Sequence, residues 1–267
     1  MPKPLAAITG ASAGLGALFA RKLAARGYDL LLIARRGDRL TQLAAELERA
    51  HGTTSEILVA DLAESADVQR VAERLAAEPR LALLVNNAGF GVPGFFVKSS
   101  IEEQLRMHRV HIDALLCLTH AALAGMVARR SGAIINVSSV AAFVRSTGSV
   151  SYSATKSWIN AFTEGLYLEL RRAQSPVTVQ ALCPGFTYTE FHDVAKVDRA
   201  AVPKALWLSP ESVVDASLSG LDRGQLFVVP GWKYKVIVAL LSTLPARLRI
   251  AVELWSPYRR QPPAPAG

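Results

Sequence analysis

The chain has 267 residues, of which 51% are hydrophobic and 19% are charged, and its formal net charge is +8. This composition excludes global disorder and provides enough apolar surface for one large α/β domain. A basic chain admits nucleic acid as a partner, but here the basic residues are dispersed and accompany no nucleic-acid-binding motif. We therefore expect a protein that does not bind nucleic acid.

The two cysteines, Cys117 and Cys183, both lie in apolar runs without the spacing of metal ligands. This usage predicts two buried thiols in a reducing compartment and no metal site. No signal-peptide pattern precedes the first apolar segment, and no uninterrupted apolar run approaches the length that spans a bilayer. These features favour a cytoplasmic protein.

The first apolar run, Leu5 to Thr9, is followed by a glycine-rich stretch and then by helical apolar spacing from Leu18 to Arg26. Small residues between a strand and a helix let the backbone approach a pyrophosphate, and the helix N-terminus offers N–H donors. The glycine spacing is G-x-x-x-G-x-G rather than the commoner G-x-G-x-x-G. The predicted dinucleotide contacts in this turn are Gly10, Ser12, Ala13, Gly14, Leu15 and Gly16.

The predicted second strand, Asp29 to Ala34, ends directly before Arg35 and Arg36. In a dinucleotide-binding unit the end of this strand meets the adenosine ribose, where an acidic residue would bind the ribose hydroxyls. Arginine instead grips a 2′-phosphate. The sequence therefore favours NADP(H) over NAD(H), with Arg35 as the preferred direct contact. The alternative is that both arginines only begin the next helix, Asp38 to Ala50.

Strands and helices continue to alternate along the chain up to residue 231. The further predicted strands are Glu56–Ala60, Leu81–Val85, Gly132–Ser138, Val177–Cys183 and Gln225–Val229. The helices between and after them are Val68–Ala77, Ile101–Arg130, Tyr152–Arg172 and one that begins at the predicted cap Ser209. This alternation predicts one α/β Rossmann-type domain over 1–231, a doubly wound parallel sheet of seven strands flanked by helices.

Tyr152 and Lys156 stand four residues apart at the start of a predicted helix. Positions four apart share one helix face. A neighbouring cation favours phenolate, so Lys156 is expected to lower the pKa of Tyr152. A tyrosine tuned in this way can exchange a proton with an alcohol or carbonyl oxygen. Taken alone, such a pair also occurs by chance on solvated helices.

Together these motifs resemble the short-chain dehydrogenase/reductase superfamily over roughly Leu5 to Val229. The resemblance rests on T-G-x-x-x-G-x-G, Asp61, Asn86-Asn87-Ala88-Gly89, Ser139, Tyr152-x-x-x-Lys156 and Pro184-Gly185. It implies an oxidoreductase that transfers a hydride between nicotinamide and a carbonyl or secondary alcohol. Tyr152 would be the general acid/base, Lys156 would lower its pKa and bind the nicotinamide ribose, and Ser139 would bind the substrate oxygen.

The resemblance also implies further cofactor contacts and an assembly. Asp61 would accept from the adenine amino group, Asn87 would line the ribose, and Pro184 would help to cover the nicotinamide. The remaining implied contacts are Leu62, Ala88, Gly89, Gly185, Thr187 and Thr189. Family members pair through their long helices, so we expect a homodimer or homotetramer through Ile101–Arg130 and Tyr152–Arg172.

One position departs from the family pattern. The family carries an asparagine in the long helix that helps to hold a water for proton relay, and here the matching residue is His111. An imidazole can also donate to or accept from a water, which would make His111 part of an altered relay. Alternatively, His111 has lost this task, and the chain is a catalytically impaired nucleotide-binding regulatory protein.

The segment 232–256 is apolar and basic, with Arg247 and Arg249 after Pro245, which should break any helix. One interpretation is a helical extension that packs on its own domain or on a second subunit. Another is an amphipathic segment that rests on a membrane or closes over a lipophilic substrate, as in a membrane-associated lipid carbonyl reductase. The proline-rich tail, 257–267, is expected to be disordered.

Overall fold

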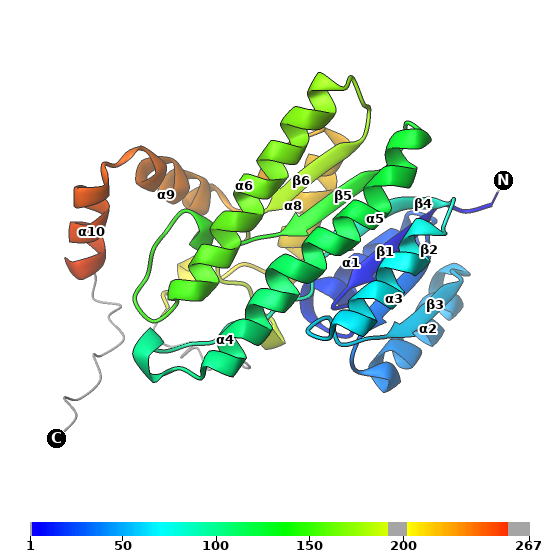
Figure 1. Ribbon diagram of the computed structural model, residues 1–267, viewed down its shortest axis with the longest axis horizontal. Helices are drawn as coiled ribbons and strands as arrows, with labels where there is room; N and C mark the ends of the chain where they lie inside the picture. The colour runs from blue at the N-terminus through cyan, green and yellow to red at the C-terminus, as the bar shows by residue number, and fades with distance from the viewer. Residues whose placement is uncertain (1, 192–201, 256–267) are drawn as a thin grey trace.

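A seven-stranded parallel sheet forms the centre of the molecule in the computed structural model, which describes residues 2–191 and 202–255 (Figure 1). The strand order is β3-β2-β1-β4-β5-β6-β7. Successive strands are added on one side of β1 as far as β3, and the chain then crosses back to add β4 to β7 on the other side of β1. The strands are β1 Leu5–Thr9, β2 Asp29–Ala34, β3 Ser55–Val59, β4 Leu81–Asn86, β5 Ala133–Val137, β6 Thr178–Leu182 and β7 Phe227–Val228. The predicted doubly wound sheet is confirmed, with most strand ends shifted by one or two residues.

Helices cover both faces of the sheet, so its central strands are buried on two sides, whereas the edge strand β3 stays partly exposed. Successive residues of β1 alternate between two cores: Ala6 and Ile8 belong to one, and Leu5 and Ala7 belong to the other. The first core includes apolar side chains of α1 (Gly14–Ala25), α2 (Gly37–His51) and α8 (Pro210–Asp222). The second includes those of α3 (Ser65–Ala76), α5 (Leu115–Ala128) and α6 (Val150–Arg172).

The long helix predicted over 101–130 is interrupted. It consists of α4 (Ile101–His108), a π-helical turn (Arg109–Ala114) and α5. Such turns are rare and often mark functional sites, and this one contains His111. By length and composition alone, Ile101–Ala128 could cross a membrane, but a core helix passes the same test. Buried Val110, Leu118 and Met126 place this stretch against the sheet.

The prediction of two buried thiols is wrong for one of them. Cys183 is buried just beyond the end of β6, whereas Cys117 is exposed on α5. The sheet side of α5 is formed by Leu118, Ala122 and Met126. Because α5 is apolar around most of its circumference, apolar sequence neighbours do not reveal which side faces solvent.

After β7 the chain forms two more helices, α9 (Trp232–Thr243) and α10 (Ala246–Trp255), which extend from the body of the domain (Figure 1). The predicted break at Pro245 is confirmed, because α9 ends and α10 begins on either side of it. The predicted cap is also confirmed: the Ser209 hydroxyl accepts from Ser212 N at 3.1 Å. The tail 257–267 lies outside the described residues.

Candidate active site

Buried amides hold β4 and β5 together at the edge of the sheet where both strands end. Asn86 Nδ2 donates to Asn136 Oδ1 at 2.9 Å and to Thr119 Oγ1 at 3.0 Å. Asn136 Nδ2 in turn donates to Thr163 Oγ1 on α6 at 3.0 Å. Parallel strands end at the same side of the sheet, so this network fixes the sheet relative to α5, which follows the turn that contains His111, and to α6, which carries Tyr152 and Lys156.

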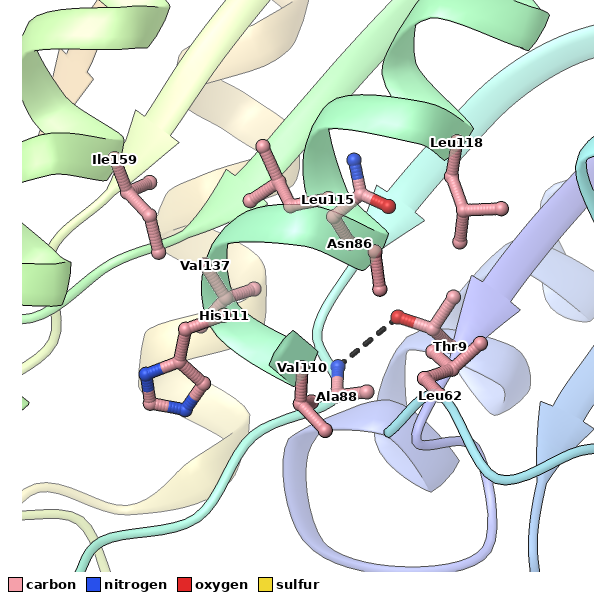
Figure 2. Close-up of a pocket in the computed structure, with 11 residues that line it drawn as sticks. Thr9, Leu62, Asn86, Ala88, Val110, His111, Leu115, Leu118, Val137 and Ile159 are labelled. Carbon is pink, nitrogen blue, oxygen red and sulfur yellow. Dashed lines mark hydrogen bonds between the residues drawn. The ribbon is translucent and has the colours of Figure 1, made fainter. Parts of the chain in front are cut away.

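The glycine-rich turn after β1 is clamped to the loop after β4. Thr9 Oγ1 accepts from the backbone N of Asn87 at 2.9 Å and of Ala88 at 3.0 Å, the second of which is drawn in Figure 2. Asn87 Nδ2 donates to Thr9 O at 2.9 Å. A Cβ on Gly16 would lie 2.3 Å from Gly10 O and 2.6 Å from Asn87 Nδ2, so only glycine fits there.

This turn fits the pyrophosphate of a dinucleotide. Gly10 has φ +67° and Gly14 has φ +54°, which are conformations that other residues rarely adopt. The turn leads directly into α1, whose first turn has no acidic residue. Its unpaired N–H groups and positive dipole end therefore favour a phosphate. Leu62 and Ala88 line a small cavity next to this turn (Figure 2).

Basic side chains gather at the end of β2, where the adenosine ribose was predicted to lie. Arg36 Nε donates to Ser12 Oγ at 3.2 Å, so this arginine reaches across to the glycine-rich turn. Arg35 is 62% exposed, and its Nη1 lies 3.8 Å from Asp61 Oδ2. Asp61 also forms an ion pair with Arg106, a residue that the sequence analysis did not single out.

Glu190 was also missed, although it closes this basic cluster. Its carboxylate accepts from Arg36 Nη1 at 3.2 Å and from Arg39 Nη1 at 2.8 Å. The hydrogen bond from Arg39 is the largest influence on the pKa of Glu190, which is lowered. A carboxylate therefore sits where the sequence predicted a phosphate-binding cluster. No spacing in the sequence relates Glu190 to residues about 150 positions earlier.

Three of the four predicted catalytic residues, Ser139, Tyr152 and Lys156, come together at the end of β5 and the start of α6. Lys156 Nζ donates to Val137 O at 2.9 Å and lies 5.7 Å from the centroid of the Tyr152 ring. Ser139 lies near enough to Tyr152 to lower the pKa of its phenol, and the Ser139 hydroxyl donates to Pro184 O at 3.4 Å. Ser138 instead donates to Lys156 O at 3.1 Å. Ser139 rather than Ser138 is thus the serine beside the tyrosine.

Burial dominates the ionisation of this pair. It lowers the pKa of Lys156 to about 7, although Cys183 acts in the opposite direction. Burial also raises the pKa of Tyr152 to about 12, and the nearby Ser139 hydroxyl opposes this rise in part. The pKa of Tyr152 is therefore raised, not lowered as expected, because burial disfavours the phenolate and Lys156 is not among the groups that shift this pKa.

His111 is buried and both its ring nitrogens have partners. Nε2 accepts from the backbone N–H of Phe90 at 3.2 Å, and Nδ1 lies 2.9 Å from Thr155 Oγ1. The Thr155 hydroxyl donates to Tyr152 O at 2.8 Å, so His111 Nδ1 carries the proton and donates to Thr155. Burial, with the nearby charges of Lys156 and His108, lowers the pKa of His111 well below 6.5.

Gly89 leaves room for this imidazole, because a Cβ there would lie 2.7 Å from His111 Nε2. A chain of hydrogen bonds thus runs from Phe90 through His111 and Thr155 to the backbone of Tyr152. These contacts occupy both ring nitrogens and favour a positioning role over a water-binding role. His111 was predicted from the sequence as a site residue, whereas Thr155 was not.

The loop after β6 borders the same site. Pro184 O accepts from Val140 N at 3.0 Å, and a Cβ on Gly14 would lie 3.5 Å from Thr189 Cβ, so the loop spans from Ser139 to the glycine-rich turn. Thr187 Oγ1 donates to Gly185 O at 3.0 Å within the loop.

Tyr234 of α9 fixes this loop from outside. Its hydroxyl accepts from Phe186 N at 3.0 Å and donates to Leu206 O at 2.7 Å. A Cβ on Gly185 would lie 2.0 Å from Tyr234 Cζ, so only glycine fits against the ring. The sequence analysis missed Tyr234 because its contacts join residues nearly 50 positions apart.

Comparison with known proteins agrees with this geometry. Residues 4–199 match the family "short chain dehydrogenase". The chain is similar to a short-chain dehydrogenase from Sphingobium yanoikuyae solved in complex with NADPH, with 36% identity, a TM-score of 0.82 and coverage of 91% of this chain and 97% of that one. It is also similar to a Burkholderia phymatum family member in complex with NAD, with 26% identity, a TM-score of 0.79 and coverage of 89% and 92%.

Among curated proteins, the chain is similar to the very-long-chain 3-oxoacyl-CoA reductase of Anas platyrhynchos. The two are 28% identical over 242 residues, which cover 87% of this chain and 75% of the relative. The family match extends over most of the chain and includes the glycine-rich turn, Ser139, Tyr152 and Lys156. The chain is therefore an oxidoreductase of the short-chain dehydrogenase family, with a nicotinamide dinucleotide as its cofactor.

Proposed function

We propose that the chain is an NADP(H)-dependent oxidoreductase that interconverts a lipophilic carbonyl compound and its secondary alcohol, with Tyr152 as the general acid/base. The observation that carries the proposal is the convergence of Ser139, Tyr152 and Lys156 beside a glycine-rich turn in which Gly16 has no room for a Cβ. Each group has the chemistry that proton transfer to a carbonyl oxygen requires.

The nicotinamide, when bound, supplies or accepts the hydride. The chain would hold this cofactor through the glycine-rich turn and the Asn87 loop, and through Arg35 and Arg36 at the 2′-phosphate. Pro184 and Thr189 would border its nicotinamide end. The support for these assignments is the fit of the cradle and the position of the two arginines at the end of β2.

In the reducing direction, Tyr152 would donate its phenolic proton to the substrate oxygen. Its raised pKa keeps it a phenol at neutral pH, so the acid form is the one present. Ser139 would donate a hydrogen bond to the same oxygen and stabilise the charge that develops there. The Lys156 ammonium, close to the ring, would stabilise the phenolate that remains after proton transfer.

The environment of Tyr152 supports an apolar substrate. Its ring lies between His111, with centroids 5.8 Å apart, and Phe191, with centroids 5.9 Å apart. Because His111 is buried, Phe191 is the aromatic side chain of the two that a substrate at the phenol would meet. The Anas platyrhynchos relative is named for a long-chain 3-oxoacyl substrate, which is consistent with this class.

The test is oxidation of NADPH by the purified chain with ketones and 3-oxoacyl thioesters of increasing chain length. We expect turnover that improves with apolar length, and a loss of about 10²–10⁴-fold in kcat for Tyr152→Phe. NADPH binding by that variant should stay close to the parent, and Tyr167→Phe, at a site remote from Lys156, serves as the control. Undiminished kcat in Tyr152→Phe would remove Tyr152 from the mechanism. NADPH binding without turnover of any carbonyl would favour a regulatory protein instead.

A further inference from the structure

Helices α9 and α10 carry an unusual share of exposed apolar side chains. Seven of the seventeen large exposed hydrophobic residues in the described part of the chain lie within these two helices. They are Trp232, Val236, Leu240, Leu248, Ile250, Leu254 and Trp255. Isolated exposed apolar residues are common, but this concentration in one segment is typical of a docking surface.

Helix α9 is apolar on two sides. Tyr234 is buried against the domain, and Ile237 and Leu241 are partly buried. Trp232, Val236 and Leu240 recur every four residues, so they share a different face, and they are 72%, 49% and 60% exposed. A helix that is apolar all round is normally enclosed. Among the described residues, the domain covers only the face of α9 that contains Tyr234.

The charges of the segment indicate what covers the other face. Lys233, Lys235, Arg247 and Arg249 are basic, and Glu253 is the only acidic residue between 232 and 255. No ion pair within the described residues includes any of the four cations. The Glu253 carboxylate accepts from Thr147 N at 2.9 Å and is thus engaged with the domain.

We propose that α9 and α10 form a docking surface for a membrane that contains anionic lipid. Apolar side chains would enter the interface, and the basic side chains would contact anionic headgroups. Tryptophan favours the boundary between lipid headgroups and acyl chains. The segment has two exposed tryptophans, Trp232 and Trp255, and Trp255 is 90% exposed. The proposal does not depend on the catalytic assignment.

Charge disfavours the other occupants. A second copy of the chain would bring the same basic segment against this one. The residues after 255 add Arg259 and Arg260 and no carboxylate side chain, so the chain's own tail has the wrong charge to cover a basic face. An anionic surface is the partner that satisfies both the apolar and the basic side chains.

The docking surface is joined to the loops on both sides of the candidate active site. Glu253 of α10 binds Thr147, five residues before Tyr152. Tyr234 of α9 binds Phe186 and Leu206, in the loops that follow β6. A membrane bound to this surface would therefore lie beside the segments that border Tyr152.

The experiment is co-sedimentation of the full chain with vesicles of phosphatidylcholine alone and of phosphatidylcholine with phosphatidylserine. We expect binding to the anionic vesicles, weakened by raised ionic strength, and little binding to the neutral ones. Arg247→Glu with Arg249→Glu should weaken binding by about tenfold or more. The double substitution Trp232→Ser, Leu240→Ser should weaken binding to anionic vesicles at every ionic strength.

Two controls separate docking from unfolding and from general surface effects. Val59→Ser with Val97→Ser removes exposed apolar side chains outside α9 and α10, and Arg49→Glu with Arg172→Glu reverses charges elsewhere. NADPH affinity and the thermal midpoint of each variant report folding. Absence of parent binding to anionic vesicles, or equal binding by the charge-reversed variant, would overturn the proposal. The proposal would also be overturned if the Trp232→Ser, Leu240→Ser variant still bound vesicles but no longer self-associated. That result would show that a second copy of the chain, not a membrane, covers α9 and α10.

Discussion

The imidazole of His111 lies edge-on to the phenol ring of Tyr152, with ring centroids 5.8 Å apart and planes at 68°. The same imidazole is linked through Thr155 to the backbone of Tyr152 and through Nε2 to the loop after β4. The π-helical turn places His111 at this position between α4 and α5. His111 thus connects three elements that must stay in register for Ser139 and Tyr152 to face one substrate oxygen.

This relationship predicts a dependence of stability on pH. Burial lowers the pKa of His111 well below 6.5, its ordinary value, so the folded protein keeps the ring neutral at pH values where the unfolded chain protonates it. The unfolded state then binds more protons, and the free energy of unfolding falls as the pH drops below 6.5. Urea unfolding of the parent should show this slope, and His111→Asn should reduce it.

The exposed His120 provides the matched control, since His120→Asn should retain the slope of the parent. His111→Leu, which removes both hydrogen bonds of the imidazole without supplying the amide that the family carries here, should lower kcat more than NADPH affinity, because these contacts reach Tyr152 rather than the glycine-rich turn. Equal slopes in the parent and in His111→Asn would show that His111 is not the titrating group. A kcat that does not change would remove it from the positioning of Tyr152.

A second prediction concerns Tyr234. Tyr234→Phe keeps the ring that packs on Gly185 but removes the hydroxyl bound to Phe186 N and Leu206 O. Leaving such groups unpaired costs about 1–3 kcal/mol. We expect NADPH affinity to fall, because the loop after β6 is no longer fixed, and the thermal midpoint to fall by about 2–4 °C for each kcal/mol lost. Tyr167→Phe is the control, and an unchanged dissociation constant for NADPH in Tyr234→Phe would contradict the role.

A third prediction concerns assembly. The outer faces of α5 and α6 expose Leu116, Val127 and Leu168, and Trp158 stacks on Phe162 with centroids 4.9 Å apart. These faces are where we propose that two copies pair as a homodimer or homotetramer. Leu168→Glu should shift the mass measured by light scattering towards the monomer. Val97→Glu, at a side chain that is 84% exposed outside these helices, should not. A parent that is already monomeric at micromolar concentration would refute this assignment.

The fold and the central residues of the site were accessible from sequence because their signals are local. The glycine spacing dictates the turn before α1, and the spacing of Tyr152 and Lys156 places both on one face of α6. Pro245 similarly marks the boundary between α9 and α10. Each of these features depends on residues close together in the chain.

The remaining features depend on contacts between distant segments. Glu190 meets Arg36 and Arg39 only because the loop after β6 folds over the end of β2. The pKa values of Tyr152 and Lys156 depend on how deeply the surrounding elements bury them. No sequence pattern reports burial depth, which explains why the expected direction of the tyrosine shift was wrong.

The last prediction concerns cofactor choice. Ala34 ends β2 where a carboxylate would bind the ribose of NAD(H), and Arg35 and Arg36 follow it. Replacing either arginine by alanine should weaken NADPH binding by about 1–3 kcal/mol, the scale of a charge-assisted hydrogen bond, and should leave NADH binding almost unchanged. Arg36 is the stronger candidate in the structure, because it already reaches Ser12 of the glycine-rich turn.

Glu190 provides a second test of this prediction. Its carboxylate accepts hydrogen bonds from guanidinium groups that a 2′-phosphate would use, and its negative charge would repel the phosphate. Glu190→Gln should therefore raise the ratio of NADPH to NADH affinity, whereas the arginine replacements should lower it. Glu46→Gln is the matched control, since Glu46 also accepts from an arginine, Arg21, but is remote from Ser12. The measurement is a pair of dissociation constants for each variant by fluorescence titration. If the parent binds both cofactors equally, or if neither the arginine variants nor Glu190→Gln changes the ratio, the end of β2 does not select the cofactor.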